Sequence, residues 1–171
     1  MKNLIYLLLV VFLFSNNIVK AQVAIGKQSI SSESVSLEFG SENRGLILPW
    51  VTNKDNVTEV VPGTFVFDSS DSKTKVKLAN SWMILHLLTT GTVDTTLQDS
   101  ETEQNTAKVS IGTPTDTKGI LVLEDDDKAM ILPKVESPQQ NILEPEPGTI
   151  VFDTKTQLFA VYNGAYWEFW N

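Results

Sequence analysis

The sequence predicts an all-β protein built from two tandem copies of a small antiparallel β-meander unit, joined by a polar linker. Three observations support this fold class. Short blocks of sequence recur in the same order at a nearly constant spacing. The recurring blocks are rich in β-branched and aromatic residues and are bounded by turn-forming dipeptides. No segment shows a sustained helical period of apolar residues.

Residues 1–21 have the pattern of a secretory signal peptide. Lys2 supplies a positive charge, and the apolar run from Leu4 to Phe14 ends in a polar stretch. A membrane-spanning helix needs about 20 apolar residues, so this run is too short to favour a retained anchor, which is the alternative. We expect cleavage after the small residue Ala21, so that the mature chain starts at Gln22.

Composition and charge indicate an exported protein without a nucleic-acid partner. The full chain has a net charge of −8, and loss of Lys2 and Lys20 with the signal peptide makes the mature chain more acidic still. Such a field repels phosphate backbones and anionic lipid headgroups. The chain has no cysteine, so it forms no disulfide, and no second segment is apolar enough to span a membrane after cleavage. The periplasm, the outer membrane surface and the extracellular space all remain open as locations.

The repeated blocks define the domain organisation. The first copy covers residues 22–88, the linker residues 89–107 and the second copy residues 108–171. The offset between matching blocks stays between 83 and 86 residues. The matching blocks are Val23–Gly26 with Val109–Gly112, Ser36–Phe39 with Val122–Asp125, Gly45–Val51 with Ala129–Val135, Pro62–Asp68 with Pro147–Asp153, and Asn80 and Trp82 with Asn163 and Trp167.

Each copy reads as two short strands followed by a three-stranded meander. In the second copy the meander covers residues 149–171, and Asn163-Gly164 is a strong hairpin signal between its last two strands. Pro49 and Pro133 end the strands upstream, because proline cannot donate to a β-ladder. Residues 53–61 can hold one helical turn at most. A unit this small is near the lower limit for an independent core, so the copies either pack on each other or assemble with other chains.

These motifs resemble a repeat of secreted and surface proteins of Bacteroidota, with a related pattern in phage tail-fibre-like proteins. The resemblance covers nearly the whole mature chain and implies a structural or adhesive module, sometimes oligomeric, without a catalytic site. The first copy matches the pattern at fewer positions, with Ala79 and Ser81 where the second has Tyr162 and Gly164. In the second copy it rests on Ile111, Gly112, Leu123, Glu124, Ile131 to Pro133, Gly148, Val151, Phe152, Thr154, Tyr162 to Gly164 and Trp167.

Few residues offer catalytic or metal-binding chemistry. His86 is the only histidine, so neither a nucleophilic triad nor a zinc site is expected, and no cofactor is predicted. The carboxylates from Glu124 to Asp127 form the one acidic cluster. Their spacing is not that of a known calcium loop, which favours a solvated turn and leaves cation binding open.

Aromatic residues are the best candidates for interaction. Trp82 and Trp167 occupy equivalent positions, which predicts a structural role. Trp50, Tyr166 and Trp170 are predicted interaction residues, since aromatic side chains anchor interfaces or stack on sugars. Packing within the fold is the alternative for Trp50 and is favoured for Trp170. In the linker, Thr95 lies in a sequence that resembles a bacterial O-glycosylation acceptor.

The sequence therefore predicts a non-enzymatic exported β-repeat protein. It would act as a structural, adhesive or accessory interaction subunit at the outer membrane or cell surface. Its partner would be an envelope or surface protein, or further copies of itself in a homo-oligomer. The alternative is a carbohydrate-binding module that binds glycans through exposed tryptophans.

Overall fold

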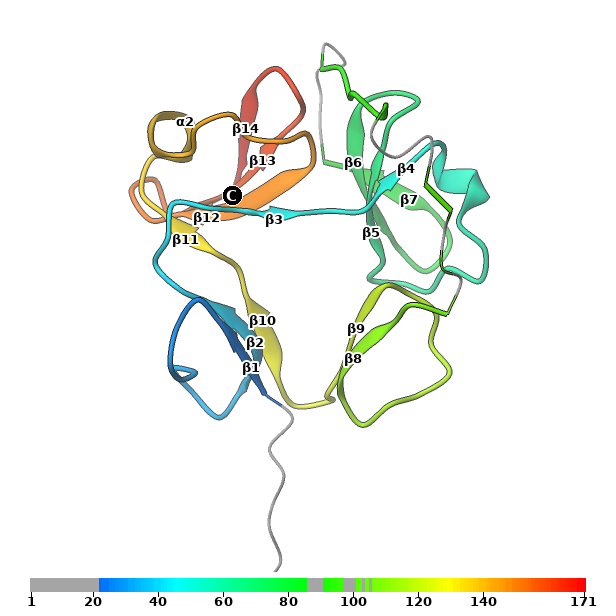
Figure 1. Ribbon diagram of the computed structural model, residues 1–171, viewed down its shortest axis with the longest axis horizontal. Coiled ribbons are helices and arrows are strands. Elements are labelled where there is room, and N and C mark those ends of the chain that lie inside the picture. Colours follow the sequence, from blue (N-terminus) through cyan, green and yellow to red (C-terminus); the bar gives the residue numbers. More distant parts are fainter. Residues whose placement is uncertain (1–21, 86–90, 97–100, 103, 105) are drawn as a thin grey trace, which may run out of the picture.

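The computed structural model describes residues 22–85, 91–96, 101–102, 104 and 106–171 (Figure 1). The predicted signal peptide, His86 and part of the linker lie outside the described residues. The prediction of an all-β repeat fold is confirmed: strands dominate, and they occur in the same order in both copies.

Each copy begins with a parallel pair of strands. In the first copy β1 (Val23–Ile25) pairs with β2 (Val35–Phe39), and in the second copy β8 (Val109–Gly112) pairs with β9 (Leu121–Glu124). The sequence prediction did not include these parallel pairs. A glutamate at the same position in both copies holds the loop that joins the strands: Glu38 accepts from the backbone N–H of Ser31 at 2.7 Å, and Glu124 accepts from that of Thr115 at 2.8 Å.

Each copy ends in the predicted antiparallel meander. The first meander contains β5 (Phe65–Asp68), β6 (Lys73–Lys77) and β7 (Trp82–Ile84), and the second contains β12 (Thr149–Asp153), β13 (Leu158–Tyr162) and β14 (Trp167–Trp170). A short parallel strand flanks each one, β4 (Trp50–Val51) beside β5 and β11 (Lys134–Val135) beside β12. The crossovers contain one helical turn each, the 3-10 helix η1 (Lys54–Asn56) and α2 (Pro138–Asn141).

A buried aspartate closes the crossover in both copies. Asp68 accepts from the backbone N–H of Lys54 at 2.9 Å, and Asp153 accepts from that of Ser137 at 2.9 Å. Both aspartates are 1% exposed or less. Because the same acid fixes the same turn twice, the duplication extends to hydrogen bonds that shape the backbone.

The last hairpin corrects one detail of the sequence comparison. Lys77 faces Trp82 across β6 and β7, and Tyr162 faces Trp167 across β13 and β14. The tryptophans are therefore equivalent, as predicted. The connecting turns have equal length, however, so Leu78 and not Asn80 holds the place of Asn163. Both turns close with the same backbone bond, Leu78 N–H to Ser81 and Asn163 N–H to Tyr166.

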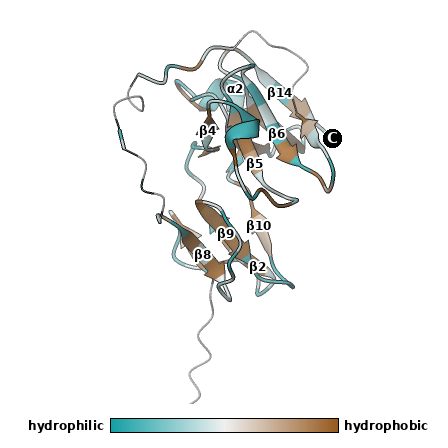
Figure 2. Ribbon diagram, turned by 90° about the vertical axis from the view of Figure 1, so that its right-hand side faces the viewer, coloured by the Kyte–Doolittle hydropathy of each residue, from teal (hydrophilic) through white to brown (hydrophobic). Residues whose placement is uncertain are grey.

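Two short strands connect the copies to each other. They are β3 (Leu46–Ile47), in the first copy, and β10 (Ala129–Ile131), in the second. β3 pairs with β12 of the second copy, and β10 pairs with β2 of the first. Figure 1 shows β3 crossing from the side of the second meander to that of the first. Figure 2 shows the parallel pairs gathered at one end of the molecule and the meanders at the other.

Candidate functional site

The two copies share one hydrophobic core. Its buried cluster combines Leu48 and Phe67 from the first copy with Ile150 and Val161 from the second. Phe67 is completely buried. Of the two arrangements that the sequence left open, packing of the copies on each other is therefore present within one chain. The interface between the copies therefore combines a shared hydrophobic cluster with strand pairing.

Pairing of β3 with β12 brings the backbones of the copies together. Ile47 faces Thr149, Leu46 faces Ile150, and the N–H of Leu48 donates to the carbonyl of Gly148 at 3.1 Å. Gly148 has a φ of +79°, and a Cβ there would lie 2.9 Å from the Cβ of Phe67. Glycine at this position therefore permits both the turn and the close approach of the first copy.

Trp50 adds a side-chain contact to the same interface. Its Nε1 donates to the carbonyl oxygen of Pro147 at 2.6 Å, and its half-buried ring packs against the shared core. The structure thus places this predicted interaction residue between the two copies of its own chain. The sequence could not predict that the Pro147 carbonyl accepts this hydrogen bond, because every residue has a backbone carbonyl.

Pairing of β10 with β2 forms the second contact between the copies. The N–H of Ala129 donates to the carbonyl of Ser34 at 2.9 Å, and the hydroxyl of Ser36 donates to the Asp125 carboxylate at 2.5 Å. The Ser36 hydroxyl and the Lys128 ammonium lower the pKa of Asp125 below its usual value. Ser36 was not singled out in the sequence, where a serine in a β-strand is unremarkable.

The other two predicted interaction residues lie at the end of the second meander. Tyr166 is 57% exposed in the turn between β13 and β14. Trp170 is half-buried in β14 opposite Phe159, and its buried Nε1 has no hydrogen-bond partner. Trp50 lies elsewhere, in the interface, so the three predicted residues do not form one cluster in the contacts that the structure describes.

The start of the linker is anchored to the second copy. Gly91 is buried close to the backbone of Asn163, and Val93 packs against the shared core. Thr95 follows and is partly exposed. Asp94 accepts from the hydroxyl of Thr96 at 2.7 Å and from its N–H at 3.0 Å, which makes a tight turn around Thr95.

Three carboxylates of the acidic cluster accept hydrogen bonds from nearby donor groups. Glu124 accepts from Ser110 at 2.6 Å and from Thr115, and these hydrogen bonds lower its pKa to about 2. Asp125 and Asp127 both receive the Lys128 ammonium. In the described part of the chain no three acidic, histidine or cysteine side chains converge as metal ligands would.

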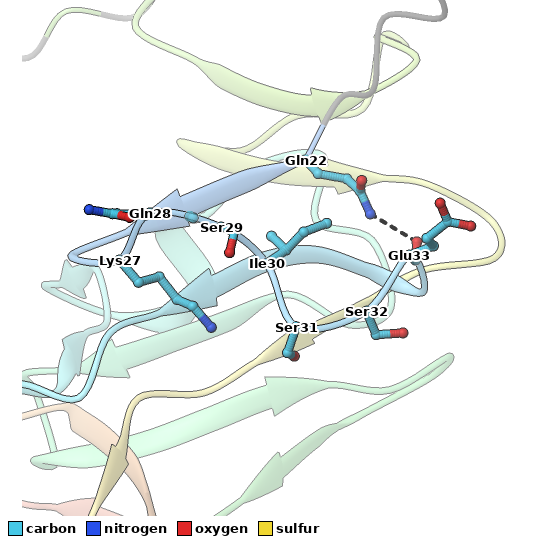
Figure 3. Close-up of a pocket in the computed structure, with 9 residues that line it drawn as sticks. Gln22, Lys27, Gln28, Ser29, Ile30, Ser31, Ser32 and Glu33 are labelled. Carbon is cyan, nitrogen blue, oxygen red and sulfur yellow. Dashed lines mark hydrogen bonds between the residues drawn. The ribbon is translucent and has the colours of Figure 1, made fainter.

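A polar hollow lies under the loop between β1 and β2 (Figure 3). The side chain of Gln22 donates to the carbonyls of Glu33 and Val35, both at 2.8 Å. Lys27 is paired with Glu38 at 2.7 Å. Because the hydrogen bonds of Gln22 and the ion pair of Lys27 fix the conformation of the loop, these polar groups have a structural role in the hollow. An apolar hollow of about 370 Å³ lies instead between the copies, lined by Ile47, Leu48, Pro49, Trp50, Ile120 and Glu146.

No helix in the described ranges is both long and apolar enough to cross a bilayer.

Comparison with known protein families gives a match to the second copy. Residues 108–171 match the model of a family described as a phage tail like trimerisation region. The match covers the parallel pair β8–β9, the crossing strand β10 and the whole second meander. No curated protein and no solved structure matches the chain.

Proposed function

We propose that this chain is a non-enzymatic structural protein whose two β-repeats are assembly units of a tail-fibre-like homo-oligomer. The observation that carries the proposal is the shared core, in which Phe67 of one copy packs beside Ile150 and Val161 of the other. The match of residues 108–171 to a trimerisation region supports the same role. A unit that uses its neighbour to complete its core is well suited to assembly.

Light scattering coupled to size-exclusion chromatography on residues 22–171 tests the proposal. The expected result is a single species with the mass of several chains, most simply three, at micromolar concentration. A monodisperse monomer at all concentrations would defeat the proposal.

We further propose that the protein is exported and acts at the outer membrane or cell surface as a structural or adhesive subunit. The support is the signal-peptide pattern of residues 1–21 and the acidic, cysteine-free composition of the remainder. Amino-terminal sequencing of the protein from the producing cell should begin at Gln22. Protease treatment of intact cells then separates a surface location, where the protein is digested, from a periplasmic one, where it is protected.

A further inference from the structure

The strands β2 and β9 hold equivalent positions in the two copies but differ in what covers them. β2 lies between β1 and β10, whereas among the described residues β9 pairs with β8 alone. Four of the five residues of β2 are buried, and none of the four residues of β9 is buried. One edge of β9 is therefore open at the place where the equivalent strand receives β10.

The open edge of β9 carries backbone groups that are directed away from β8. The N–H of Val109 in β8 donates to the carbonyl of Ile120 at 2.8 Å. Neighbouring residues of a strand direct their backbone groups to opposite sides, so Leu121 directs its N–H and its carbonyl to the open side. Backbone groups at an exposed edge are a template for pairing with another strand.

The open edge is also more apolar than the covered one. Ile120 is 62% exposed and Leu121 is 40% exposed. Their equivalents in the first copy are Ser34, whose carbonyl accepts from the N–H of Ala129 at 2.9 Å, and Val35, which is 3% exposed. Exposed aliphatic side chains beside an open pairing edge indicate a binding surface.

The apolar hollow between the copies extends this surface. Ile120 lines the hollow together with Ile47 and Trp50 of the first copy. Ile47 is 51% exposed although β3 pairs with β12. The surface is therefore continuous with the contact between the copies, and a strand added to β9 would bring its side chains beside the hollow.

The first copy shows what kind of segment fits such an edge. β10, which covers β2, has the sequence Ala-Met-Ile and lies between Lys128 and Lys134. Glu146 lines the hollow and the chain has a net charge of −8, so basic residues beside the aliphatic run complement the surface. A segment that fits β9 is therefore extended, aliphatic and flanked by basic residues, and it pairs in parallel, as β10 does with β2.

A second copy of this chain does not offer such a segment in its own fold. Its two segments of this type, β3 and β10, already pair within the chain, so neither is free. We infer that the open edge of β9 is an acceptor site for an extended aliphatic segment, with basic flanks, of a different polypeptide. In strand addition, main-chain hydrogen bonds supply affinity and alternate side chains supply specificity. The inference goes beyond the proposed assembly role and does not depend on it.

A synthetic peptide of residues 127–135 with a fluorescent label provides the probe, because it contains the β10 sequence outside the fold. Fluorescence anisotropy measures its binding to the chain of residues 22–171. The expected result is saturable binding at one site per chain, and a control peptide with Ile131→Asp should bind more weakly. No binding of the unaltered peptide would overturn the inference.

Variants of Leu121 locate the binding on β9. Leu121→Pro removes the N–H on the open side and keeps the pairing with β8, since proline is tolerated at the first residue of a strand. It should weaken peptide binding about three- to tenfold, the effect of one lost hydrogen bond. Leu121→Lys, the second variant, should also weaken binding, because it removes the apolar contact and repels the basic flanks of the peptide.

The matched control is Leu143→Lys, since Leu143 is 85% exposed and belongs to no strand. It should bind the peptide as the wild type does. Equal affinities for the wild type and both Leu121 variants would overturn the assignment of this edge.

Light scattering with and without the peptide separates a different polypeptide from a second copy as the occupant. An oligomer whose mass changes only by the bound peptide supports the inference, because the edge of β9 is then accessible in the oligomer. An oligomer that the peptide dissociates would show that a second copy covers β9, and would overturn the assignment to a different polypeptide. A monomer that binds the peptide would defeat the proposed function and leave the acceptor site standing.

Discussion

Asp68 and Asp153 hold the same position in the two copies but are stabilised by different groups. Asp68 pairs with the ammonium of Lys75 at 2.8 Å, and Lys75 also reaches Asp71 at 2.7 Å. The residue equivalent to Lys75 in the second copy is Ala160, which is fully buried. Asp153 relies instead on neutral donors, the Thr156 hydroxyl at 2.7 Å and backbone N–H groups.

The difference shows which features the fold requires. Both copies keep the hydrogen bond from the aspartate to the crossover backbone, since that bond shapes the turn. The cation Lys75 in the first copy corresponds to the apolar Ala160 in the second. Either an ion pair or a well-packed apolar side chain is compatible with a buried position beside the aspartate. The paired phenylalanines differ in the same manner: Phe67 is enclosed by the other copy, whereas its equivalent Phe152 is half-buried.

Truncation of the two phenylalanines should give the largest contrast. Phe67→Ala should lower the free energy of unfolding by about 3–5 kcal/mol, because it leaves a cavity in the core that both copies share. Phe152→Ala should cost only about 1–2 kcal/mol, since less apolar area is lost. Urea denaturation at one fixed protein concentration measures both. Equal losses would mean that the contact between the copies contributes little to stability.

Acid should expose the difference between the two aspartates. Burial alone would raise the pKa of Asp68, but hydrogen bonds from Lys75, Ser70 and the Lys54 backbone lower it to about 2. An unfolded aspartate titrates near 3.9. The unfolded state therefore binds more protons between about pH 4 and pH 2, and the stabilisation present above this window is lost as the pH falls through it.

Melting temperatures from pH 6 to pH 2 test this expectation. Asp68→Asn should lower the melting temperature at pH 6 and flatten its fall in acid. Asp153→Asn is the matched variant. Burial alone would raise the pKa of Asp153, but hydrogen bonds from the Thr156 hydroxyl and from backbone N–H groups lower it below its usual value. An acid-induced loss in Asp68→Asn as steep as in wild type would remove Asp68 as its source.

Substitution of two equivalent glycines distinguishes the cost of backbone strain from the cost of a clash between the copies. Gly63 and Gly148 have φ values of +91° and +79°, so alanine is strained by about 1–2 kcal/mol at either one. An added Cβ at Gly63 meets nothing within 4 Å, whereas at Gly148 it meets Phe67. Gly148→Ala should therefore cost about 1–3 kcal/mol more than Gly63→Ala, the usual range for overpacking. The difference between the two denaturation curves is the measurement.

Local features of this fold could be predicted, and pairings between the copies could not. The meander strands follow from alternating β-branched and aromatic residues, and the Asn163-Gly164 turn follows from turn chemistry. The buried Asn163 confirms that turn, with its Oδ1 accepting from the N–H groups of Ala165 and Tyr166.

Strands β3 and β10 show why the pairings between the copies could not be predicted from the sequence. The sequence Ile-Leu-Pro occurs in both copies, at residues 47–49 and 131–133, and fits a sheet edge in either one. Only the three-dimensional arrangement decides that β3 binds the second meander while β10 binds the first parallel pair. Residue type alone pairs Asn80 with Asn163, whereas the turn length assigns that place to Leu78.

The smallest expected effect concerns the hydrogen bond of Trp50. Trp50→Phe keeps an aromatic ring against the shared core but removes the donor to the Pro147 carbonyl, a bond of 2.6 Å. The expected cost is about 1 kcal/mol. Trp82→Phe is the matched control, because the Trp82 ring contacts Lys77 within its own copy, with the ammonium 5.8 Å from the ring centroid. If urea denaturation shows the same loss for both variants, the Trp50 bond adds nothing specific to the joint between the copies. A larger loss for Trp50→Phe, together with a lower oligomer mass, would show that this joint also supports assembly.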